Sequence, residues 1–408
     1  MPSSTPALTL DDVREHVRSR CLPASTQDRV GIELEWLTVG PEPEGDVSLA
    51  SLHEVAERVH PLPGDSLITF EPGGQLELSS RCHDSVGTAC MAMVADTAVV
   101  REELGTLGIR LMGLGIDPYR VRPRLVHSPR YDAMEAFFDH DHPAGRTMMC
   151  STAATQVNLD AGPHDVAARR WERALVFGPV LAAVFANSPI AAGAPTGWRS
   201  TRLATWSYID ASRTGPPCVG GDPVDEWTSY VLDARVMLLR QSTDQFATLD
   251  RPLTFRDWVC EGHEGGYPTA DDLDYHISTL FPPVRARGWL ELRMIDALPD
   301  PWWRVAVAIT TALVYDEEAA ARAIDAGRRT GRLWDAAARH GLSHPDLAAA
   351  ARRCFAAALE ALPRIGADPS TASAAVRFYE RYVARGRCPA DDVLEAWQHD
   401  PRLVAVGQ

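Results

Sequence analysis

Glutamates recur at alternate positions within short apolar segments of the chain. Glu33 and Glu35 alternate with Ile, Leu and Trp, and Glu77 lies in a similar stretch from Gln75 to Ser79. Because successive side chains of a β-strand point to opposite faces, each pattern predicts carboxylates on one face and apolar residues on the other. Glu71 precedes a Pro-Gly-Gly bend that could aim its carboxylate at the same place.

Two further segments alternate in the same way. Gln156 and Asn158 lie among apolar neighbours, and Glu291 and Arg293 do likewise from Trp289 onward. If the four segments are strands of one sheet, one face is core and the other is a polar, ligand-facing floor. An ordinary solvated face is the simpler interpretation of any single strand. Four such strands are rich in glutamate on one face and apolar on the other. Together they favour a ligand-facing floor over a solvated face.

Crowded carboxylates have raised pKa values unless cations neutralise them, and hard oxygen donors favour Mg²⁺ or Mn²⁺ over zinc. Arginines near such a site stabilise the negative charge on a phosphoryl group during its transfer. Taken singly, each arginine is more typical of a solvated surface. The candidates are Arg199, Arg202, Arg213, Arg285, Arg287 and Arg293.

The composition narrows the chemistry further. The sequence contains no lysine, so all 40 basic side chains are arginine, which excludes a Walker A phosphate loop and Schiff-base catalysis. The net charge of -15 argues against nucleic-acid or anionic-membrane partners. Small molecules are the expected partners of a monomer or weak dimer.

Several other residues remain open. His276 could be a base or a ligand, but a hydrogen-bonded structural histidine is the more ordinary interpretation. Trp198 lies beside arginines where a base could stack, although packing is the commoner role. The loop from Glu261 to Pro268 and the Arg130-Tyr131 segment are candidates for an acceptor pocket.

The elements that position these residues read as an α+β body. Alternation predicts strands at 30–39, 75–79, 109–116, 155–159 and 289–295, and spacings of three and four predict helices at 10–19, 85–107, 164–186 and 302–326. Irregular strand spacing favours a mostly antiparallel sheet. We expect residues 1–316 to form the catalytic body and residues 317–408 a helical region packed on it.

Eight scattered cysteines, without a CxxC pair, suggest neither zinc nor a disulfide framework, and reduced thiols fit a cytoplasmic protein. The polar, acidic start of the chain does not resemble a signal peptide. The apolar stretch 175–186 contains a proline and is too short to span a bilayer.

The sequence resembles the plant-type glutamate-cysteine ligases, and among them the actinobacterial members that serve ergothioneine biosynthesis. The resemblance extends from about Val30 to Glu317. It is most specific in the stretch from Glu71 to Ser79 and in the run ending at Arg293, and weaker in Phe185 to Pro189. It implies a glutamine-synthetase-like fold with ATP as co-substrate, magnesium, and L-glutamate and L-cysteine as substrates.

The resemblance also implies roles for the candidate residues. Glu33, Glu35, Glu71, Glu77 and Glu291 would bind metal. Glu77, Arg213 and Arg293 would be catalytic, and Gln156, Asn158, Arg202, Arg285 and Arg287 would bind the nucleotide. Where the plant enzymes carry a lysine, this chain has Arg287, which keeps the charge but changes the geometry. A ligase with another acceptor amine and a non-catalytic binder of glutamate or nucleotide are the alternatives.

Overall fold

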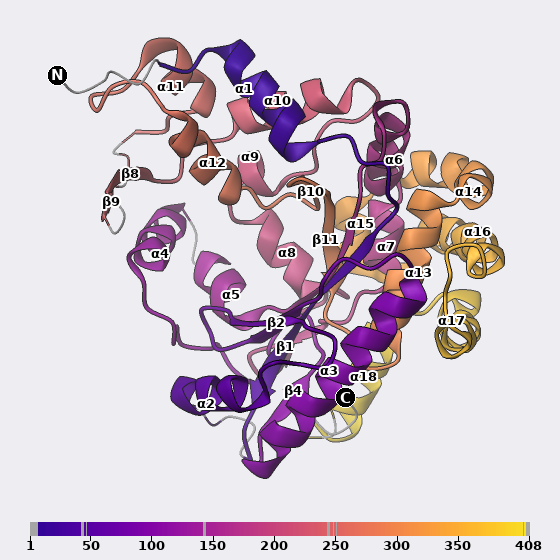
Figure 1. Ribbon diagram of the computed structural model, residues 1–408. Helices are drawn as coiled ribbons and strands as arrows, with labels where there is room; N and C mark the ends of the chain where they lie inside the picture. The colour runs from indigo at the N-terminus through magenta and orange to yellow at the C-terminus, as the bar shows by residue number, and fades with distance from the viewer. Residues whose placement is uncertain are drawn as a thin grey trace.

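A computed structural model of the chain describes residues 7–41, 45, 47–141, 144–242, 245–247, 249, 251–402 and 404. Within these residues a seven-stranded sheet has the order β10-β11-β5-β1-β3-β2, with β4 paired to β1, and every pairing is antiparallel. Figure 1 shows this sheet between helices α13 to α17 on one side and α4 and α5 on the other. The predicted α+β class with an antiparallel sheet is confirmed.

The central strand is β1 (Val30–Val39), which pairs with β3 (Leu76–Ser79), β4 (Arg110–Met112) and β5 (Ala154–Leu159). Its register places Glu33 opposite Gln156 and Glu35 opposite Glu77. On the far side of β5, strand β11 (Leu290–Asp296) places Glu291 opposite Asn158. The predicted strands therefore lie side by side, and their polar residues share one face.

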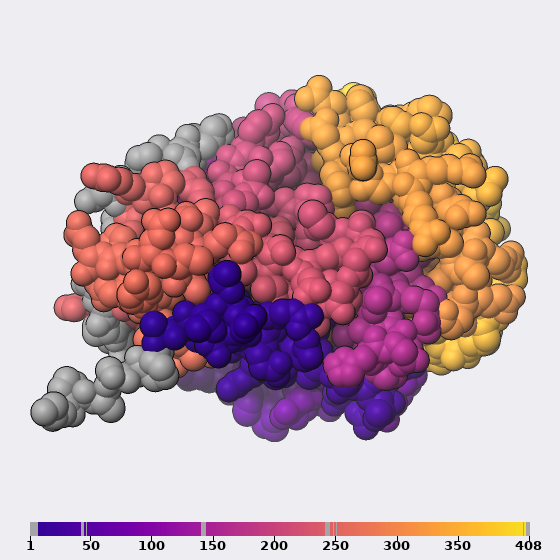
Figure 2. Space-filling model, turned by 90° about the horizontal axis from the view of Figure 1, so that it is seen from above, coloured from indigo at the N-terminus to yellow at the C-terminus, as the bar shows by residue number. Residues whose placement is uncertain are grey.

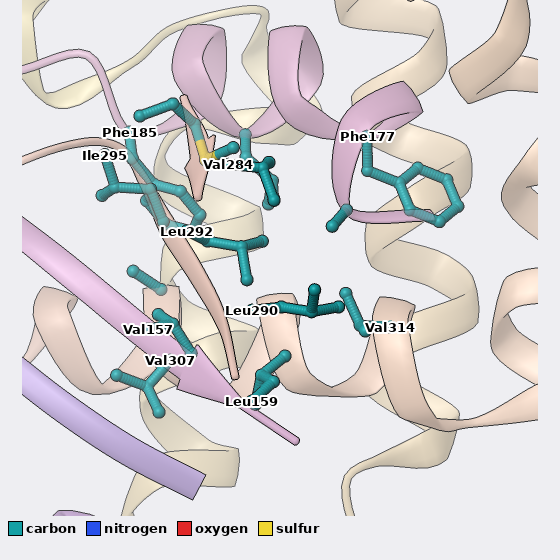
Figure 3. Close-up of a cluster of buried hydrophobic side chains, with 14 of the residues drawn as sticks. Val157, Leu159, Phe177, Phe185, Val284, Leu290, Leu292, Ile295, Val307 and Val314 are labelled. Atoms are coloured by element: carbon teal, nitrogen blue, oxygen red, sulfur yellow. The ribbon is translucent and has the colours of Figure 1, made fainter. Parts of the chain in front are cut away.

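The apolar face of the sheet is sealed by helices. Val157 and Leu159 of β5 and Leu290 and Leu292 of β11 are fully buried. Figure 3 shows them beside Phe177 and Phe185, which flank α7 (Gly178–Val184), and beside Val307 and Val314 of α13 (Trp302–Tyr315). Helix α7 contacts β11, and α13 contacts β5. Alternation between an apolar and a polar face thus turns the polar residues away from the core.

All four predicted helices are found, and three of them are divided. The stretch 10–19 is α1 (Leu10–His16) followed by the π-helix η1 (Val17–Cys21). The stretch 164–186 is α6 (His164–Val176) and α7, because Pro179 has no N–H to continue the helical hydrogen bonds. Gly178 packs so closely on Trp334 that a Cβ would lie 2.2 Å from its ring. The stretch 302–326 divides where Asp316 caps α14 (Glu317–Thr330). The stretch 85–107 is one helix, α3 (Val86–Thr106).

The other elements complete the body. The remaining strands are β2 (Leu67–Phe70), β6 (Ile190–Ala191), β7 (Ala194–Pro195), β8 (Leu239–Ser242), β9 (Gln245–Ala247) and β10 (Val284–Ala286). The remaining helices before α13 are α2 (Leu49–Val59), α4 (Pro129–Asp141), α5 (Ala144–Ser151), α8 (Thr201–Ser207), α9 (Ala211–Thr214), α10 (Pro223–Asp233), α11 (Phe255–Glu261) and α12 (Ala270–Ser278). None of the described helices has the length and apolar character needed to cross a bilayer.

The C-terminal region is helical, as expected. After α14 it contains α15 (Trp334–His340), η2 (Gly341–Ser343), α16 (Pro345–Ala361), α17 (Pro369–Arg381), η3 (Val383–Arg385) and α18 (Pro389–His399). In Figure 2 these helices, orange to yellow, abut the magenta and pink atoms of the middle of the chain. Phe355 and Phe378 stack on one another and contact Phe185 of the body. The division at residue 316 stays a prediction.

Candidate functional site

The polar face of the sheet forms the floor of a cavity of about 790 Å³. Strands β1, β3, β5 and β11 supply this floor, and helices α4, α5 and α8 supply side chains around it. Of the predicted site residues, the cavity is lined by Glu33, Glu35, Glu71, Glu77, Gln156, Asn158, Arg202, Arg285, Arg287 and Arg293. Residues far apart in the sequence therefore meet at one place, as the alternation predicted.

Four glutamates concentrate negative charge in the cavity. Burial, and then the charges of Glu291 and Glu77, raise the pKa of Glu33 to about 7. Burial also raises the pKa values of Glu35, Glu71 and Glu77, and neighbouring carboxylates add to the effect. Like charges directly opposite one another, as Glu35 and Glu77 are, cost stability. The four carboxylates thus repel one another, and a cation bound among them would relieve this repulsion.

Glu71 reaches the cavity because of the bend that follows it. Gly74 has a φ of +78°, which favours glycine, and its N–H donates to the Glu71 carbonyl at 2.8 Å. A Cβ on Gly73 would lie 1.9 Å from the carbonyl oxygen of Cys150 in α5. The Gln75 carboxamide then ties the bend to the body, since its oxygen accepts from Gly73 N at 2.9 Å and its nitrogen donates to Thr152 O at 2.9 Å.

Both carboxamides of β5 donate to glutamates of β1. Gln156 Nε2 lies 2.8 Å from Glu35 Oε1, and Asn158 Nδ2 lies 2.9 Å from Glu33 Oε1. Glu35 also accepts from the Ala154 N–H at 2.9 Å. Hydrogen bonds to the ionised form favour it, so the amides partly offset the crowding of charge.

Glu291 differs from the other glutamates. It is fully buried, and its two oxygens accept from Arg285 at 2.6 and 3.0 Å and from Arg293 at 3.0 Å. Burial would raise its pKa, but the charges of Arg285 and Arg293 outweigh burial and lower it to about 2. Glu291 does not line the cavity. In this structure Glu291 is an ion-pair hub that holds arginines in position. The metal-binding role that the resemblance implied for it stays a prediction.

The arginines fall into three groups. Arg287 is the most open, with 54% of its side chain exposed and its guanidinium 3.6 Å from Glu291. Arg285, Arg293 and Arg202 line the cavity but are anchored, Arg202 by donation to the Arg293 carbonyl at 3.0 Å. Arg213, in contrast, is not among the cavity residues.

Arg213 is instead part of the supporting framework. Its guanidinium is fully buried and donates to Asp210 at 3.0 Å, to the Thr279 carbonyl at 2.8 Å and to the Arg235 carbonyl. These bonds tie α9, which contains Arg213, to the residue that follows α12 and to the segment after α10. The structure does not bring Arg213 to the predicted site, so we no longer assign it a catalytic role.

His276 also lies in the framework. Its Nε2 is 2.9 Å from the Val231 carbonyl, and its ring stacks on Phe255 at 4.6 Å. Burial, followed by the charge of Arg213, lowers its pKa to about 3, although the bond to Val231 opposes the shift. The ordinary interpretation of a structural histidine fits this position.

A pH-dependent cost to stability follows from buried His276. The unfolded chain takes up a proton near pH 6.5 that the folded chain refuses until about pH 3, so stability falls as the pH drops through this window and is unaffected above it. The slope is about 1.4 kcal/mol per pH unit. His276→Gln keeps a donor but does not titrate. We expect its free energy of unfolding, measured with urea from pH 7 to pH 4, to depend less on pH than that of the wild type, by that slope. Equal slopes in the two proteins would contradict the assignment.

The cavity contains residues that the sequence patterns did not single out. Trp206 and Phe281 form part of its wall, and Met148 and Met149 come from α5. Arg130 and Tyr131, named as acceptor-pocket candidates, line the cavity, whereas residues 261–268 do not. These side chains come from helices and turns, where no alternation marks the face that will meet the sheet.

A smaller, mainly apolar pocket of about 250 Å³ adjoins the cavity. Arg202, Trp206, Phe281 and Arg293 line both. A β-bulge in β11 between Leu292 and Ile295 breaks strict alternation, and Met294, next to Arg293, reaches the smaller pocket. Trp198 also lines this pocket, with the Arg339 guanidinium 4.4 Å over its ring.

The glutamates supply the type of donor atom that a divalent cation prefers, but they do not form a complete set of ligands by themselves. In the described part of the chain, no three His, Cys, Asp or Glu side chains are arranged as a group that could hold a metal ion. Magnesium is commonly bound through one or two carboxylates together with substrate phosphates and water. Four hard-oxygen donors that repel one another are consistent with such a shared site.

Comparisons with known proteins agree with this chemistry. Residues 29–406 match the family described as Glutamate-cysteine ligase family 2 (GCS2). The chain is 41% identical over 402 residues to the glutamate-cysteine ligase EgtA of Mycobacterium tuberculosis, an alignment covering 96% of this chain and 90% of the relative. It is 40% identical to EgtA of Mycolicibacterium smegmatis, covering 96% and 91%. The chloroplastic glutamate-cysteine ligase of Medicago truncatula is 29% identical, covering 79% and 68%.

A solved structure shares the fold. The glutamate-cysteine ligase of Francisella tularensis, determined in complex with AMP, superposes with a TM-score of 0.57 at 16% identity, covering 92% of this chain and 86% of that one. The family match spans most of the sequence, including every strand of the sheet. This chain belongs to glutamate-cysteine ligase family 2.

Proposed function

We propose that the protein is an ATP-dependent glutamate-cysteine ligase that joins the γ-carboxylate of L-glutamate to the amine of L-cysteine, and that the product serves ergothioneine biosynthesis. Family membership and 41% identity to EgtA support the reaction. The observation that carries the proposal is the convergence of Glu33, Glu35, Glu71 and Glu77 with arginines in one cavity.

The reaction needs activation because a carboxylate oxygen is a poor leaving group. The γ-carboxylate attacks the γ-phosphorus of ATP, which breaks the bond to the β-phosphate oxygen and yields γ-glutamyl phosphate and ADP. The cysteine amine then attacks the acyl carbon, phosphate leaves, and the amine loses a proton. Bringing the reactants together in one cavity supplies much of the rate enhancement. No covalent bond to the protein is required.

The acidic side chains are proposed to hold magnesium, or manganese in its place. Glu33, Glu35, Glu71 and Glu77 are the candidate ligands. A divalent cation held by these residues would neutralise negative charge that develops on the phosphates. Gln156 and Asn158 hold Glu35 and Glu33 in position, and they keep these carboxylates apart through separate hydrogen bonds.

The arginines are proposed to bind the anionic parts of the substrates. Arg287 is the candidate for the phosphates because its guanidinium is the most exposed of the cavity arginines described above. Arg202 and Arg293 lie where the cavity meets the smaller pocket, and both are set by fixed hydrogen bonds. Such preorganised cations stabilise developing negative charge without reorganising during the reaction.

An ADP-release assay with detection of the dipeptide by mass tests the proposed function. With magnesium, ATP and glutamate, we expect ADP to form at an appreciable rate only when cysteine is added, together with γ-glutamylcysteine. Equal rates with other amines would show a ligase of different acceptor specificity. Failure to release ADP with any amino acid would favour a binding protein and overturn the proposal.

We further propose that the enzyme works as a monomer or weak dimer in the cytoplasm. All eight cysteines are free, and Cys21, Cys90, Cys150, Cys354 and Cys388 are buried. Unpaired thiols support a reducing compartment. Light scattering of the purified protein at several concentrations tests the assembly.

Substituting Arg287 is expected to weaken nucleotide binding without unfolding the protein. Arg287→Ala removes an exposed cation from the cavity, so the KM for ATP should rise about tenfold while the melting temperature stays unchanged. Arg287→Lys should recover part of the loss, because charge returns without the planar fork. Arg328→Ala, with a similar exposure of 55% on α14, is the matched control. An unchanged KM for ATP in Arg287→Ala would contradict the assignment.

A further inference from the structure

Trp289 is a cavity residue that the proposed chemistry leaves without a role. It lies in the turn between β10 and β11 and is half-buried. Its carbonyl accepts from Arg287 N at 2.9 Å, and Gly288 N donates to the Cys21 carbonyl at 2.8 Å, so the turn is held to η1. The Trp289 indole Nε1 donates to Asn158 Oδ1 at 3.0 Å.

This hydrogen bond determines which way the Asn158 amide points. An indole N–H is a donor and cannot accept, so the atom that faces it must be the amide oxygen. The amide nitrogen must then face the other way, where it lies 2.9 Å from Glu33 Oε1. If the amide were reversed, its nitrogen would face the indole N–H of Trp289 and its oxygen would face the Glu33 carboxylate. Neither hydrogen bond could then form.

The position of Asn158 leaves its amide few other choices. Its backbone is fixed between Gly31 of β1 and Glu291 of β11 by the sheet register. A Cβ on Gly31 would lie 3.3 Å from the Asn158 Cβ, so glycine keeps this crossing open. Rotation of the amide is therefore the main freedom left, and Trp289 removes it.

A second relay with the same design lies two residues away on β5. Arg293 donates to Gln156 Oε1 at 2.6 Å, and Gln156 Nε2 donates to Glu35 Oε1 at 2.8 Å. A guanidinium, like an indole, can only donate. Both glutamates of β1 are thus oriented from the β11 side through a carboxamide of β5, which argues against coincidence at Trp289.

We propose that Trp289 is a positioning residue that acts through Asn158 to hold the Glu33 carboxylate in the orientation that the bound cation and nucleotide require. The inference rests on the proposed function in taking the cavity as the nucleotide site. Groups that orient a metal ligand commonly change metal affinity by about tenfold or more when they are removed. Trp289→Phe is the informative change, because phenylalanine keeps an aromatic face below Arg287, 5.7 Å from the Trp289 ring, and removes only the donor.

The test measures binding of Mn²⁺ and ADP to the full chain without glutamate or cysteine, by electron paramagnetic resonance. We expect Trp289→Phe to raise the Mn²⁺ dissociation constant about tenfold and Asn158→Ala to do at least as much. If Trp289 acts through Asn158, the double variant should match Asn158→Ala within about twofold. Effects of the two changes that multiply would overturn the proposal, as would unchanged affinity in Trp289→Phe.

A matched control separates this role from general packing. Trp258 donates its indole N–H to the Gly266 carbonyl at the same distance, 3.0 Å, and does not line the cavity. Trp258→Phe should leave Mn²⁺ affinity unchanged, and a loss equal to that of Trp289→Phe would overturn the proposal. If the variants show the coupled effect on Mn²⁺ affinity but the wild-type protein releases no ADP, only the ligase assignment is refuted. Failure of the wild-type protein to bind Mn²⁺ with ADP would refute the positioning role.

Discussion

Glu77→Gln is expected to abolish ADP release while the protein stays folded. The substitution removes one of four carboxylates that crowd the cavity and leaves a side chain of the same shape. If Glu77 helps to bind the cation beneath the phosphates, turnover should fall on the order of 10³-fold. Measuring ADP release with glutamate and cysteine at saturating magnesium tests this directly.

Stability is expected to change in the opposite direction. Glu77 accepts from Thr69 at 2.8 Å and Ser79 at 3.0 Å, and a glutamine oxygen can accept the same bonds. The change also removes a charge opposite Glu35, worth roughly 0.2–1 kcal/mol in favour of the variant. Urea unfolding should therefore show equal or greater stability. Glu57→Gln, exposed on α2, is the control, and ordinary turnover by Glu77→Gln would end the metal assignment.

The floor could be predicted from the sequence because alternation is a local property. In each of β1, β3, β5 and β11, the alternation of polar and apolar residues shows which side chains share a face. The polar faces lie on the same side of the sheet once the strands pair. The glutamates at 33, 35 and 77 needed no knowledge of register to be grouped. Strand β10 has only three residues, Val284–Ala286, and is too short for such a pattern.

The roles of Glu291 and Arg213 depend on pairings that no local pattern reveals. Glu291 is neutralised by Arg285 because the β10–β11 hairpin places the two residues opposite each other. Arg213 is satisfied by carbonyls 66 and 22 residues away in the chain. In each case the residue type suggested a functional charge, whereas the structure pairs that charge with other groups of the protein. The sequence shows which groups are charged, and tertiary structure decides which charges remain unpaired.

This difference between paired and unpaired carboxylates also explains how the cavity can be both acidic and stable. Glu291 fixes Arg285 and Arg293, and Arg293 in turn orients Gln156 toward Glu35. The buried ion pairs therefore hold one side of the floor in position while the four cavity glutamates remain available. Removing a cavity glutamate should therefore leave the folded protein equally or more stable, whereas removing Glu291 should make it less stable.

Glu291→Gln is accordingly expected to destabilise the protein strongly. The change leaves Arg285 and Arg293 buried near each other without the carboxylate that compensates them, and breaking a buried ion pair from one side costs about 3–5 kcal/mol. Urea unfolding at pH 7 measures the loss, and Glu360→Gln, which breaks the exposed pair with Arg322, should leave stability almost unchanged. If Glu291→Gln instead unfolded like the wild type but lost metal binding, Glu291 would be a ligand after all, and the hub that we assign to it would be wrong.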